Sequence, residues 1–252
     1  MSVELGGRYL EAVTELMRRI HDTQGAAIDA AAHLLADQIA ADRLVYVYAP
    51  GGHSNLAAQE IFFRAGGLMH VSAILDSGTM LSDGALRSMA IERLPGYGRI
   101  VIDDAGLGSG DLLILVNAYG INAALIDAAL AAREKGVKTI GVSSRSHASQ
   151  TSAEHPARHP SKKNLYEVVD QHIDTFVPVG DAVIQVGHAV EKSGPVSTFA
   201  NAYTLNWLML ATIEVLDSRG IEVPIWRSGN APGGDEANAR FLDRFRGRVK
   251  WL

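Results

Sequence analysis

The sequence contains no cysteine among its 252 residues. This absence excludes disulfides, cysteine-ligated zinc, iron–sulfur clusters and a thiol nucleophile. Aromatic residues make up only 6% of the chain, which argues against a surface that stacks nucleic-acid bases. Basic residues are also fewer than acidic ones: the chain has 23 Lys and Arg against 28 Asp and Glu, which gives a net charge of −5. Without a basic excess to neutralise a phosphate backbone, we expect no nucleic-acid partner.

Long apolar runs are missing as well. The segment Thr204–Leu216 comes closest, but Asn206 and Glu214 interrupt it, and it falls short of the ~18 residues of a membrane span. The first residues, MSVELGGRYLEAV, do not follow the basic and then apolar layout of a signal peptide. Together with the absence of cysteine, these features predict a cytoplasmic protein that does not bind membranes.

Short apolar runs alternate with helical segments along the chain. The run 111–116 (DLLILV) is the clearest strand, since it is apolar on both faces like a central parallel strand. Strand followed by loop and helix, repeated in order, predicts parallel strands joined by crossover helices. The predicted strands cover residues 44–48, 69–75, 111–116, 137–143, 173–178 and 183–186, and the predicted helices cover 54–64, 83–93, 122–135 and 197–219.

Two further helices are predicted before the first strand. Apolar residues recur at helical spacing over 9–20 and again over 26–40, and Gly25 is expected to end the first run. The sequence therefore predicts one doubly wound domain in three parts. A helical arm covers residues 1–42, an αβα core covers 43–220, and a C-terminal tail covers 221–252.

Four loops carry the candidate chemistry. They are 50–55 (PGGHSN), 117–122 (NAYGIN), 143–145 (SSR) and 194–198 (GPVST), and each follows a predicted strand or opens a predicted helix. In open parallel sheets such loops meet beyond the carboxyl ends of the strands, where ligands bind. Free backbone N–H groups at helix starts, close to small or hydroxyl side chains, favour an anion. G-x-G-x-x-G, Walker A and G-x-S-x-G motifs are all missing, so neither a dinucleotide nor a serine hydrolase elbow is indicated.

These residues resemble the sugar isomerase (SIS) phosphosugar-binding domain. The resemblance rests on Gly52-His53-Ser54, then AAQEIFFRAGGL, ERLPGYGRI, DLLILVNAYGIN and GVKTIGVSSR in that order. HPSKKNLYEVVD, VPVGDAVIQV, EKSGPVSTFANAYTLN and APGGDEANARF further resemble an uncharacterised bacterial family of SIS-domain proteins. The resemblance implies a three-layer αβα sandwich with a parallel five-stranded sheet. It also implies a sugar-phosphate ligand and subunits that pair into dimers or tetramers with sites at their interfaces.

One loop departs from the SIS pattern. Where SIS domains usually have Ser-x-Ser-Gly-x-Thr, this chain has Asn117-Ala118-Tyr119-Gly120-Ile121-Asn122. This loop keeps the backbone N–H donors and the helix start of the usual SIS loop, but it lacks the hydroxyl donors. We therefore expect other hydroxyl groups to hold the phosphate, namely those of Ser143, Ser144, Ser197 and Thr198.

The candidate catalytic residues are Glu60, His53 and His188. By the resemblance, Glu60 stands where sedoheptulose-7-phosphate isomerases place a histidine near the reacting end of the sugar; the alternative is an i,i+4 ion pair with Arg64. His53 follows the first strand, and the imidazole pKa near neutrality suits proton transfer. The predicted ligand-binding residues are Gly52, Ser54, Asn117, Tyr119, Gly120, Asn122, Ser143, Ser144, Arg145, Ser197 and Thr198.

These residues favour an aldose–ketose isomerase that acts on a sugar phosphate with a carboxylate or histidine base. A non-catalytic sugar-phosphate-binding or regulatory protein and a phosphosugar lyase or etherase remain alternatives. The polar segment 145–163 is predicted to be a long loop, and its histidines, His147, His155 and His159, lack carboxylates at an orderly metal-ligand spacing. We therefore expect neither a metal nor a cofactor.

Overall fold

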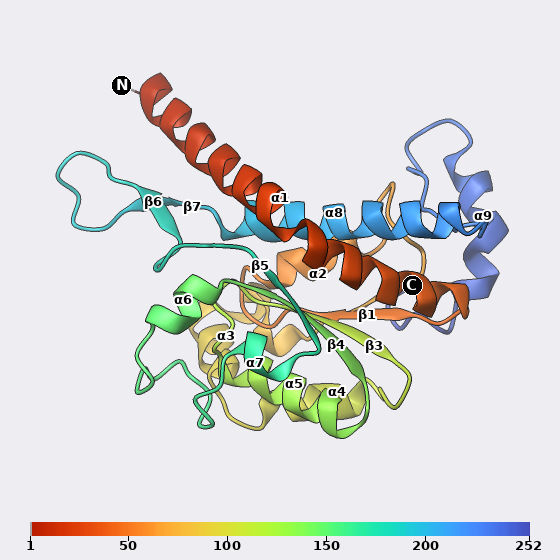
Figure 1. Ribbon diagram of the computed structural model, residues 1–252, viewed down its shortest axis with the longest axis horizontal. Helices are drawn as coiled ribbons and strands as arrows, with labels where there is room; N and C mark the ends of the chain where they lie inside the picture. Colours follow the sequence, from red (N-terminus) through yellow and green to blue (C-terminus); the bar gives the residue numbers. More distant parts are fainter. Residues whose placement is uncertain (1) are drawn as a thin grey trace.

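A five-stranded parallel sheet forms the centre of the structure, a computed structural model that describes residues 2–252 (Figure 1). The strand order is β2-β1-β3-β4-β5, so β3 lies in the middle. All five residues of β3 are buried, as the apolar run 111–116 predicted. The strands are β1 (Val45–Tyr48), β2 (Val71–Ile74), β3 (Leu112–Val116), β4 (Lys138–Ser143) and β5 (Gln171–Asp174). Because every pairing is parallel, the carboxyl ends of all five strands lie at one edge.

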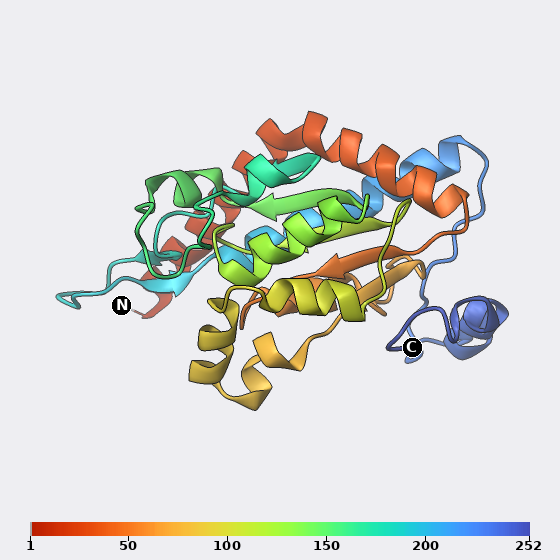
Figure 2. The ribbon, with the colours of Figure 1, turned by 90° about the horizontal axis from the view of Figure 1, so that it is seen from below.

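Helices cover both faces of this sheet. One face packs against α1 (Ser2–Ala40), α2 (Asn55–Ile61) and α8 (Ser197–Ser218), and the other against α4 (Tyr97–Asp104), α5 (Ala123–Glu134) and α7 (Leu165–Val168). Figure 2 shows α4 and α5 side by side over the second face. Side chains alternate along β3, with Ile114 facing the first layer and Leu113 the second. The predicted three-layer αβα sandwich is confirmed.

The remaining elements lie at the ends of this sandwich. Two short 3-10 turns, Ser77–Thr79 and Leu81–Asp83, lead from β2 into α3 (Ala85–Glu92), and α6 (Arg145–Gln150) follows β4. β6 (Ala182–Ile184) and β7 (Ser193–Pro195) pair in a separate antiparallel hairpin, which projects beside the N-terminal end of α1 (Figure 1). α9 (Gly234–Phe245) lies in the C-terminal segment. None of the helices described here is both long and apolar enough to cross a membrane.

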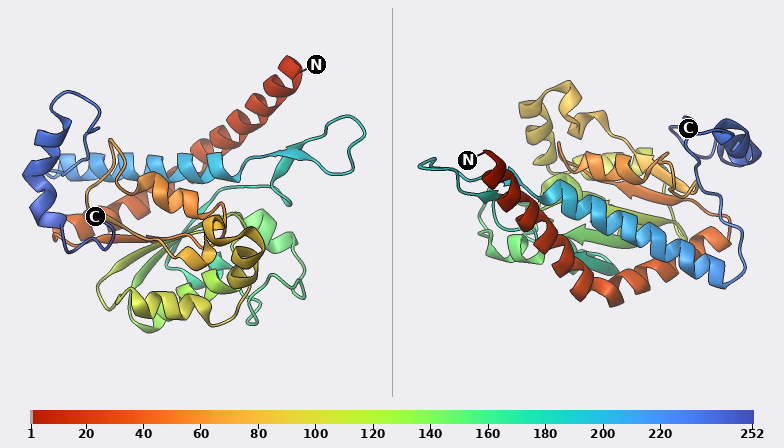
Figure 3. Two further views of the ribbon diagram at one scale, coloured as in Figure 1. Left: turned by 180° about the vertical axis from the view of Figure 1, so that it is seen from behind. Right: turned by 90° about the horizontal axis from the view of Figure 1, so that it is seen from above.

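The prediction of two N-terminal helices separated at Gly25 is wrong. α1 is continuous over 39 residues, although it changes direction near its middle (Figure 3). Its buried residues Ile20, Ile28 and Leu35 continue across Gly25 and pack against α8 and the sheet. Packing of this kind outweighs the roughly 1 kcal/mol that a glycine costs inside a helix.

Other boundaries also differ from the predictions. The sequence indicated no helix over α4, and it predicted a loop where α6 forms. The run 183–186 is a strand candidate whose observed counterpart, β6, lies outside the central sheet. The helix predicted over 197–219 is α8, which begins at Ser197 directly after β7 and Val196. α4 and α6 are too short to be stable by themselves. α4 packs against α5, and Ser144, which caps α6, donates to Val177 O.

The C-terminal segment packs at the amino edge of the sheet. Trp226, Phe245 and Val249 form a small core with Leu44 and Met69, which precede β1 and β2. This core lies at the opposite edge from the loops that follow the strands, so it does not contribute to a site there.

Replacing Gly25 with alanine should stabilise the protein by about 0.5–1 kcal/mol, because alanine restricts the unfolded chain and suits a helix better. A Cβ at Gly25 meets nothing within 4 Å, whereas a Cβ at Gly98 would lie 1.9 Å from the Ala124 carbonyl oxygen. Urea unfolding is the measurement, and Gly98→Ala is the matched control, which should destabilise. A Gly25→Ala variant less stable than the wild type would contradict the continuous α1 helix.

Candidate functional site

Three loops that the sequence predicted to meet do meet at the carboxyl edge of the sheet. They surround a cavity of about 350 Å³, called here the central cavity. Seven predicted site residues line it: Gly52, His53, Ser54, Asn117, Tyr119, Ser197 and Thr198. Glu92 and Asp181 line it too, although the sequence analysis did not select either residue for the site.

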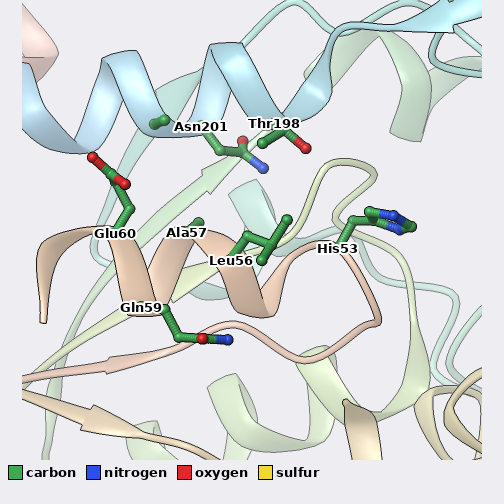
Figure 4. A pocket seen from close by; sticks show the side chains of 8 residues that line it. His53, Leu56, Ala57, Gln59, Glu60, Thr198 and Asn201 are labelled. Atoms are coloured by element: carbon green, nitrogen blue, oxygen red, sulfur yellow. The ribbon is translucent and has the colours of Figure 1, made fainter. Parts of the chain in front are cut away.

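A second cavity of about 300 Å³, the α2–α8 cavity, lies between those two helices (Figure 4). His53 and Thr198 line both cavities, so the two adjoin. Glu60 of α2 lines the second one; its Oε1 accepts a hydrogen bond from Asn206 Nδ2 at 3.2 Å and lies 3.4 Å from Arg64 Nε. The ion pair between Glu60 and Arg64, the alternative role predicted for Glu60, is therefore also formed in the structure.

Asn201 of α8 lines the same α2–α8 cavity. The residue is only 3% exposed, and its Oδ1 is a buried oxygen without a hydrogen-bond partner in residues 2–252. An unsatisfied buried amide oxygen costs free energy, and a ligand hydroxyl group would remove that cost. Sequence spacing did not single out Asn201, because an asparagine inside a helix has no motif of its own.

A third cavity of about 580 Å³, the lateral cavity, adjoins the central cavity at Glu92, Tyr119 and Gly180. Tyr119 stacks on His147 with ring centroids 3.9 Å apart. Burial lowers the pKa of His147 to about 4, so its ring is neutral at physiological pH. Asn122 also lines this cavity, and its Oδ1 lacks a partner among the described residues.

Four of the backbone donors that the sequence analysis expected to be free are occupied. Asn117 Oδ1 accepts the N–H groups of Tyr119 and Gly120, each at 3.0 Å. The Asp181 carboxylate accepts the N–H groups of Val196 (2.9 Å) and Ser197 (2.7 Å) and the Ser197 hydroxyl (2.7 Å). Two of the predicted anion-binding loops therefore satisfy these donors inside the protein.

Glu92 is the main functional candidate that the sequence analysis missed. Because Asn117 Oδ1 accepts two N–H groups, Asn117 Nδ2 must be the donor, and it bonds Pro50 O at 2.9 Å and Glu92 Oε1 at 3.2 Å. Desolvation raises the pKa of the half-buried Glu92 to about 7, against the opposing effects of the Asn117 hydrogen bond and the Arg93 charge. A carboxyl with a pKa near neutrality in a cavity is a candidate acid–base group.

No sequence signal pointed to Glu92. It ends α3, in a stretch typical of an ordinary surface helix before Pro95-Gly96. Only the folded chain brings it against the first loop, where a Cβ at Gly51 would lie 2.8 Å from Glu92 Oε1.

Three predicted ligand residues lie beneath the site instead of lining it. Ser143 is fully buried, and its Oγ lies 3.0 Å from His172 Nε2. Arg145 Nε donates to His172 Nδ1 at 3.3 Å, so Nε2–H of that neutral ring donates to Ser143. Ser144 Oγ donates to Val177 O at 2.7 Å and caps α6. All three side chains are used in contacts that support the loops, and none lines the three cavities.

Gly120 and His188 also lie outside the cavity walls. Gly120 rests on Ser143, since a Cβ there would lie 2.6 Å from Ser143 Oγ. His188 is exposed in the segment that joins β6 and β7. The structure thus does not bring His188 to the cavities of its own chain.

Residues 2–252 contain no group of three or more His, Asp or Glu side chains placed to hold a metal ion. His147 and His155 line the lateral cavity, whereas His159 Nε2 lies 2.9 Å from Asp127 Oδ1. The three histidines of segment 145–163 therefore do not converge on one point.

Comparison with known proteins places the chain in a family. The SIS domain family model matches residues 8–144. A UPF0309 protein of Streptomyces coelicolor is 35% identical over 245 residues, covering 96% of each chain, and one of Brucella canis is 36% identical, covering 97% of this chain and 98% of its own. The chain therefore belongs to the SIS domain family and, within it, to the UPF0309 proteins.

Solved structures share the fold at low sequence identity. Phosphoheptose isomerase GmhA from Neisseria gonorrhoeae superposes with a TM-score of 0.56 at 16% identity, over 86% of this chain and all of its own. A phosphoheptose isomerase from Francisella tularensis gives 0.51 at 14% identity, over 86% and 99% of the two chains. The αβα sandwich described above is thus a SIS-type fold.

Glu92→Gln should stabilise the protein at alkaline pH. The pKa of Glu92 is about 7 in the folded protein and 4.5 as a free side chain, so the folded state binds more protons between these values and stability falls as pH rises through them. Glutamine carries no charge and removes this loss. We expect little change at pH 5 and a gain of about 1–3 kcal/mol at pH 8.

Urea unfolding at the two pH values measures this difference. Glu191→Gln, at an exposed position, is the control and should show no pH-dependent change. An equal effect of Glu92→Gln at both pH values would show that Glu92 is ionised throughout.

Proposed function

We propose that this protein binds a phosphorylated sugar at the carboxyl edge of the sheet and interconverts its aldose and ketose forms. One observation carries the proposal: the central and α2–α8 cavities share His53 and Thr198. This shared wall joins the Glu60 carboxylate, the His53 ring and the Ser54 and Thr198 hydroxyls in one connected region. Membership of the SIS domain family and the fold shared with phosphoheptose isomerases support it.

Glu60 is the proposed base. Aldose–ketose isomerisation requires a base that takes the proton from C2 while the C1 carbonyl oxygen gains one, which gives an enediol. The proton then returns to C1, and the C2 hydroxyl loses its own. Asn206 and Arg64 orient the Glu60 carboxylate through contacts at 3.2 and 3.4 Å. His53, at the junction of the two cavities, is the proposed carrier of the proton that moves between the sugar oxygens.

A non-catalytic sugar-phosphate-binding protein is the second candidate. The Asn117–Asn122 loop favours it, because this loop lacks the hydroxyl groups of the usual SIS pattern and its Tyr119 and Gly120 N–H groups are occupied. A phosphosugar lyase or etherase would use the same first proton abstraction, and it would release a product that has lost its leaving group.

Glu60→Gln should lower turnover by about 100-fold or more while the dissociation constant stays within about twofold, because the amide keeps the shape and loses the base. The measurement is NMR detection of isomerisation and of deuterium incorporation at C1 and C2, with pentose, hexose and heptose phosphates in D2O. Glu214→Gln, exposed on α8, is the matched control.

Unchanged turnover in Glu60→Gln would transfer the role of base to His53, His188 or Glu92. Binding of a sugar phosphate without any exchange by the wild type would instead establish the non-catalytic candidate.

We also propose that the protein acts in the cytoplasm as a homodimer or as a tetramer built from two dimers. α1 of the same chain covers part of α8, since Leu16 and Ile20 pack beside Ala200 and Trp207. Apolar side chains remain exposed on α8, however, including Leu210 at 65%. A helix that is apolar on more than one side usually packs on more than one side.

Leu210→Asp should reduce the mass measured by light scattering from two or four chains to one, because a charged side chain cannot be buried there without a partner. Leu86→Asp is the matched control: Leu86 is 78% exposed on α3, and the assembly should survive its replacement. A folded wild-type particle with the mass of one chain at nanomolar concentration would refute the oligomer.

A further inference from the structure

The central cavity contains the carboxyl group of Glu92, which forms no ion pair with any side chain that the structure describes. In residues 2–252, the hydrogen-bond donor to Glu92 is the neutral amide of Asn117 at 3.2 Å, and no ion pair joins its carboxylate to a Lys, Arg or His. Its neighbour Arg93 is exposed and acts on it only through space. An ionised carboxylate held in this way by a single neutral donor is poorly stabilised.

Four backbone donors at the same cavity are already occupied and are not free to bind an anionic ligand. The Tyr119 and Gly120 N–H groups point to Asn117 Oδ1, and the Val196 and Ser197 N–H groups point to Asp181. No Lys or Arg among the described residues lines the central cavity, whereas Glu92 and Asp181 do. An anion placed there next to an ionised Glu92 would be repelled, but next to a protonated Glu92 it would gain a hydrogen-bond donor.

We propose that Glu92 is an anion-recognition residue that holds a proton in the ligand-bound site, so that binding of a dianion takes up one proton. The inference rests on the proposed function for its ligand class, a sugar phosphate. Asn117 Nδ2 donates to Oε1 of Glu92, which leaves Oε2–H to donate to a phosphate oxygen. The raised pKa of Glu92, about 7, makes this proton available at low cost near neutral pH.

Several other groups around Glu92 bear on its protonation. Arg93 directly follows α3, Tyr48 lies at the end of β1 and Tyr119 lies after β3. Both tyrosines are neutral, and burial raises their pKa further. His53 and Asp181 face it across the central cavity, and His147 and His155 across the lateral cavity. Histidines also bind anions better at low pH, so the experiment has to separate their effect from that of Glu92.

Glu92→Gln makes this separation. In this variant the carbonyl of the introduced amide would accept from Asn117, and the amide NH2 group would take the place of Oε2–H as a permanent donor. The probe is sulfate, a dianion that does not titrate between pH 6.5 and 8.5. Its binding is measured by thermal-shift titration, and glucose 6-phosphate is titrated in parallel as a sugar phosphate. For the wild type we expect the sulfate dissociation constant to rise about 10- to 30-fold over this range, as expected for one coupled proton with a pKa near 7.

For Glu92→Gln we expect a sulfate dissociation constant that is flat with pH and within about threefold of the wild-type value at pH 6.5. Glu92→Ala, which has no donor, should bind sulfate about 10-fold more weakly at pH 6.5 than either. Calorimetry in two buffers of different ionisation enthalpy should show uptake approaching one proton per sulfate by the wild type at pH 8.5 and none by Glu92→Gln.

A wild-type affinity that is flat or that increases with pH would overturn the proposal, and so would a Glu92→Gln variant that keeps the wild-type slope, since the histidines would then account for it. Absence of sulfate binding at pH 6.5 would overturn it as well. The proposed function fails separately, by an absence of sugar-phosphate binding at every pH, and that outcome does not depend on the slope with sulfate.

Discussion

The Asn117 side chain connects the parts of the site that the fold brings together. Its Oδ1 closes the loop after β3 by accepting the Tyr119 and Gly120 N–H groups. Its Nδ2 donates to Pro50 O in the loop after β1 and to Glu92 at the end of α3. One buried amide thus satisfies groups from three separate segments, and buried polar networks of this kind define a single arrangement because any other would leave a donor or acceptor unpaired. The positions of the central cavity walls depend on it.

This internal satisfaction of donors changes what the site can recognise. Helix starts and glycine-rich loops favour anions because their N–H groups are usually free. Here Asn117 and Asp181 already accept four such groups, and carboxylates outnumber cations on the wall of the central cavity. Under the proposal above, the hydroxyl groups, His53 and the protonation state of Glu92 then contribute to anion recognition. The α2–α8 cavity, which contains Glu60 and the unsatisfied Asn201, adds groups suited to sugar hydroxyls.

Contacts beneath the site explain why some polar residues near strand ends do not line it. Ser143 ends β4 and Arg145 follows it, much as Asn117 follows β3, so both positions suggest ligand contacts. In the folded chain, His172 of β5 lies between them and accepts from Arg145 while donating to Ser143. Burial and the Arg145 charge lower the pKa of His172 to about 3, so the ring stays neutral and supports the loop through hydrogen bonds. The rule that ligands bind beyond the carboxyl ends of parallel strands identifies the edge of the sheet where the site lies. Contacts with neighbouring strands then decide which side chains line the cavities at that edge.

Local patterns in the sequence determined the elements with strong periodicity. The run 111–116 is apolar on both faces, and this alone required a central strand covered on both sides. The loops around Gly52–Ser54 and Asn117–Tyr119 were predicted because each lies between a strand pattern and a helix pattern, and they do meet.

Other features were decided only by the tertiary structure, because local sequence does not encode them. α1 runs through Gly25 because long-range packing on α8 outweighs a local helix breaker. Glu92 enters the site from a helix with no motif, because the path of the chain between β2 and β3 brings α3 against the first loop. Burial raises the pKa of Glu92, and that burial arises only when distant segments pack together.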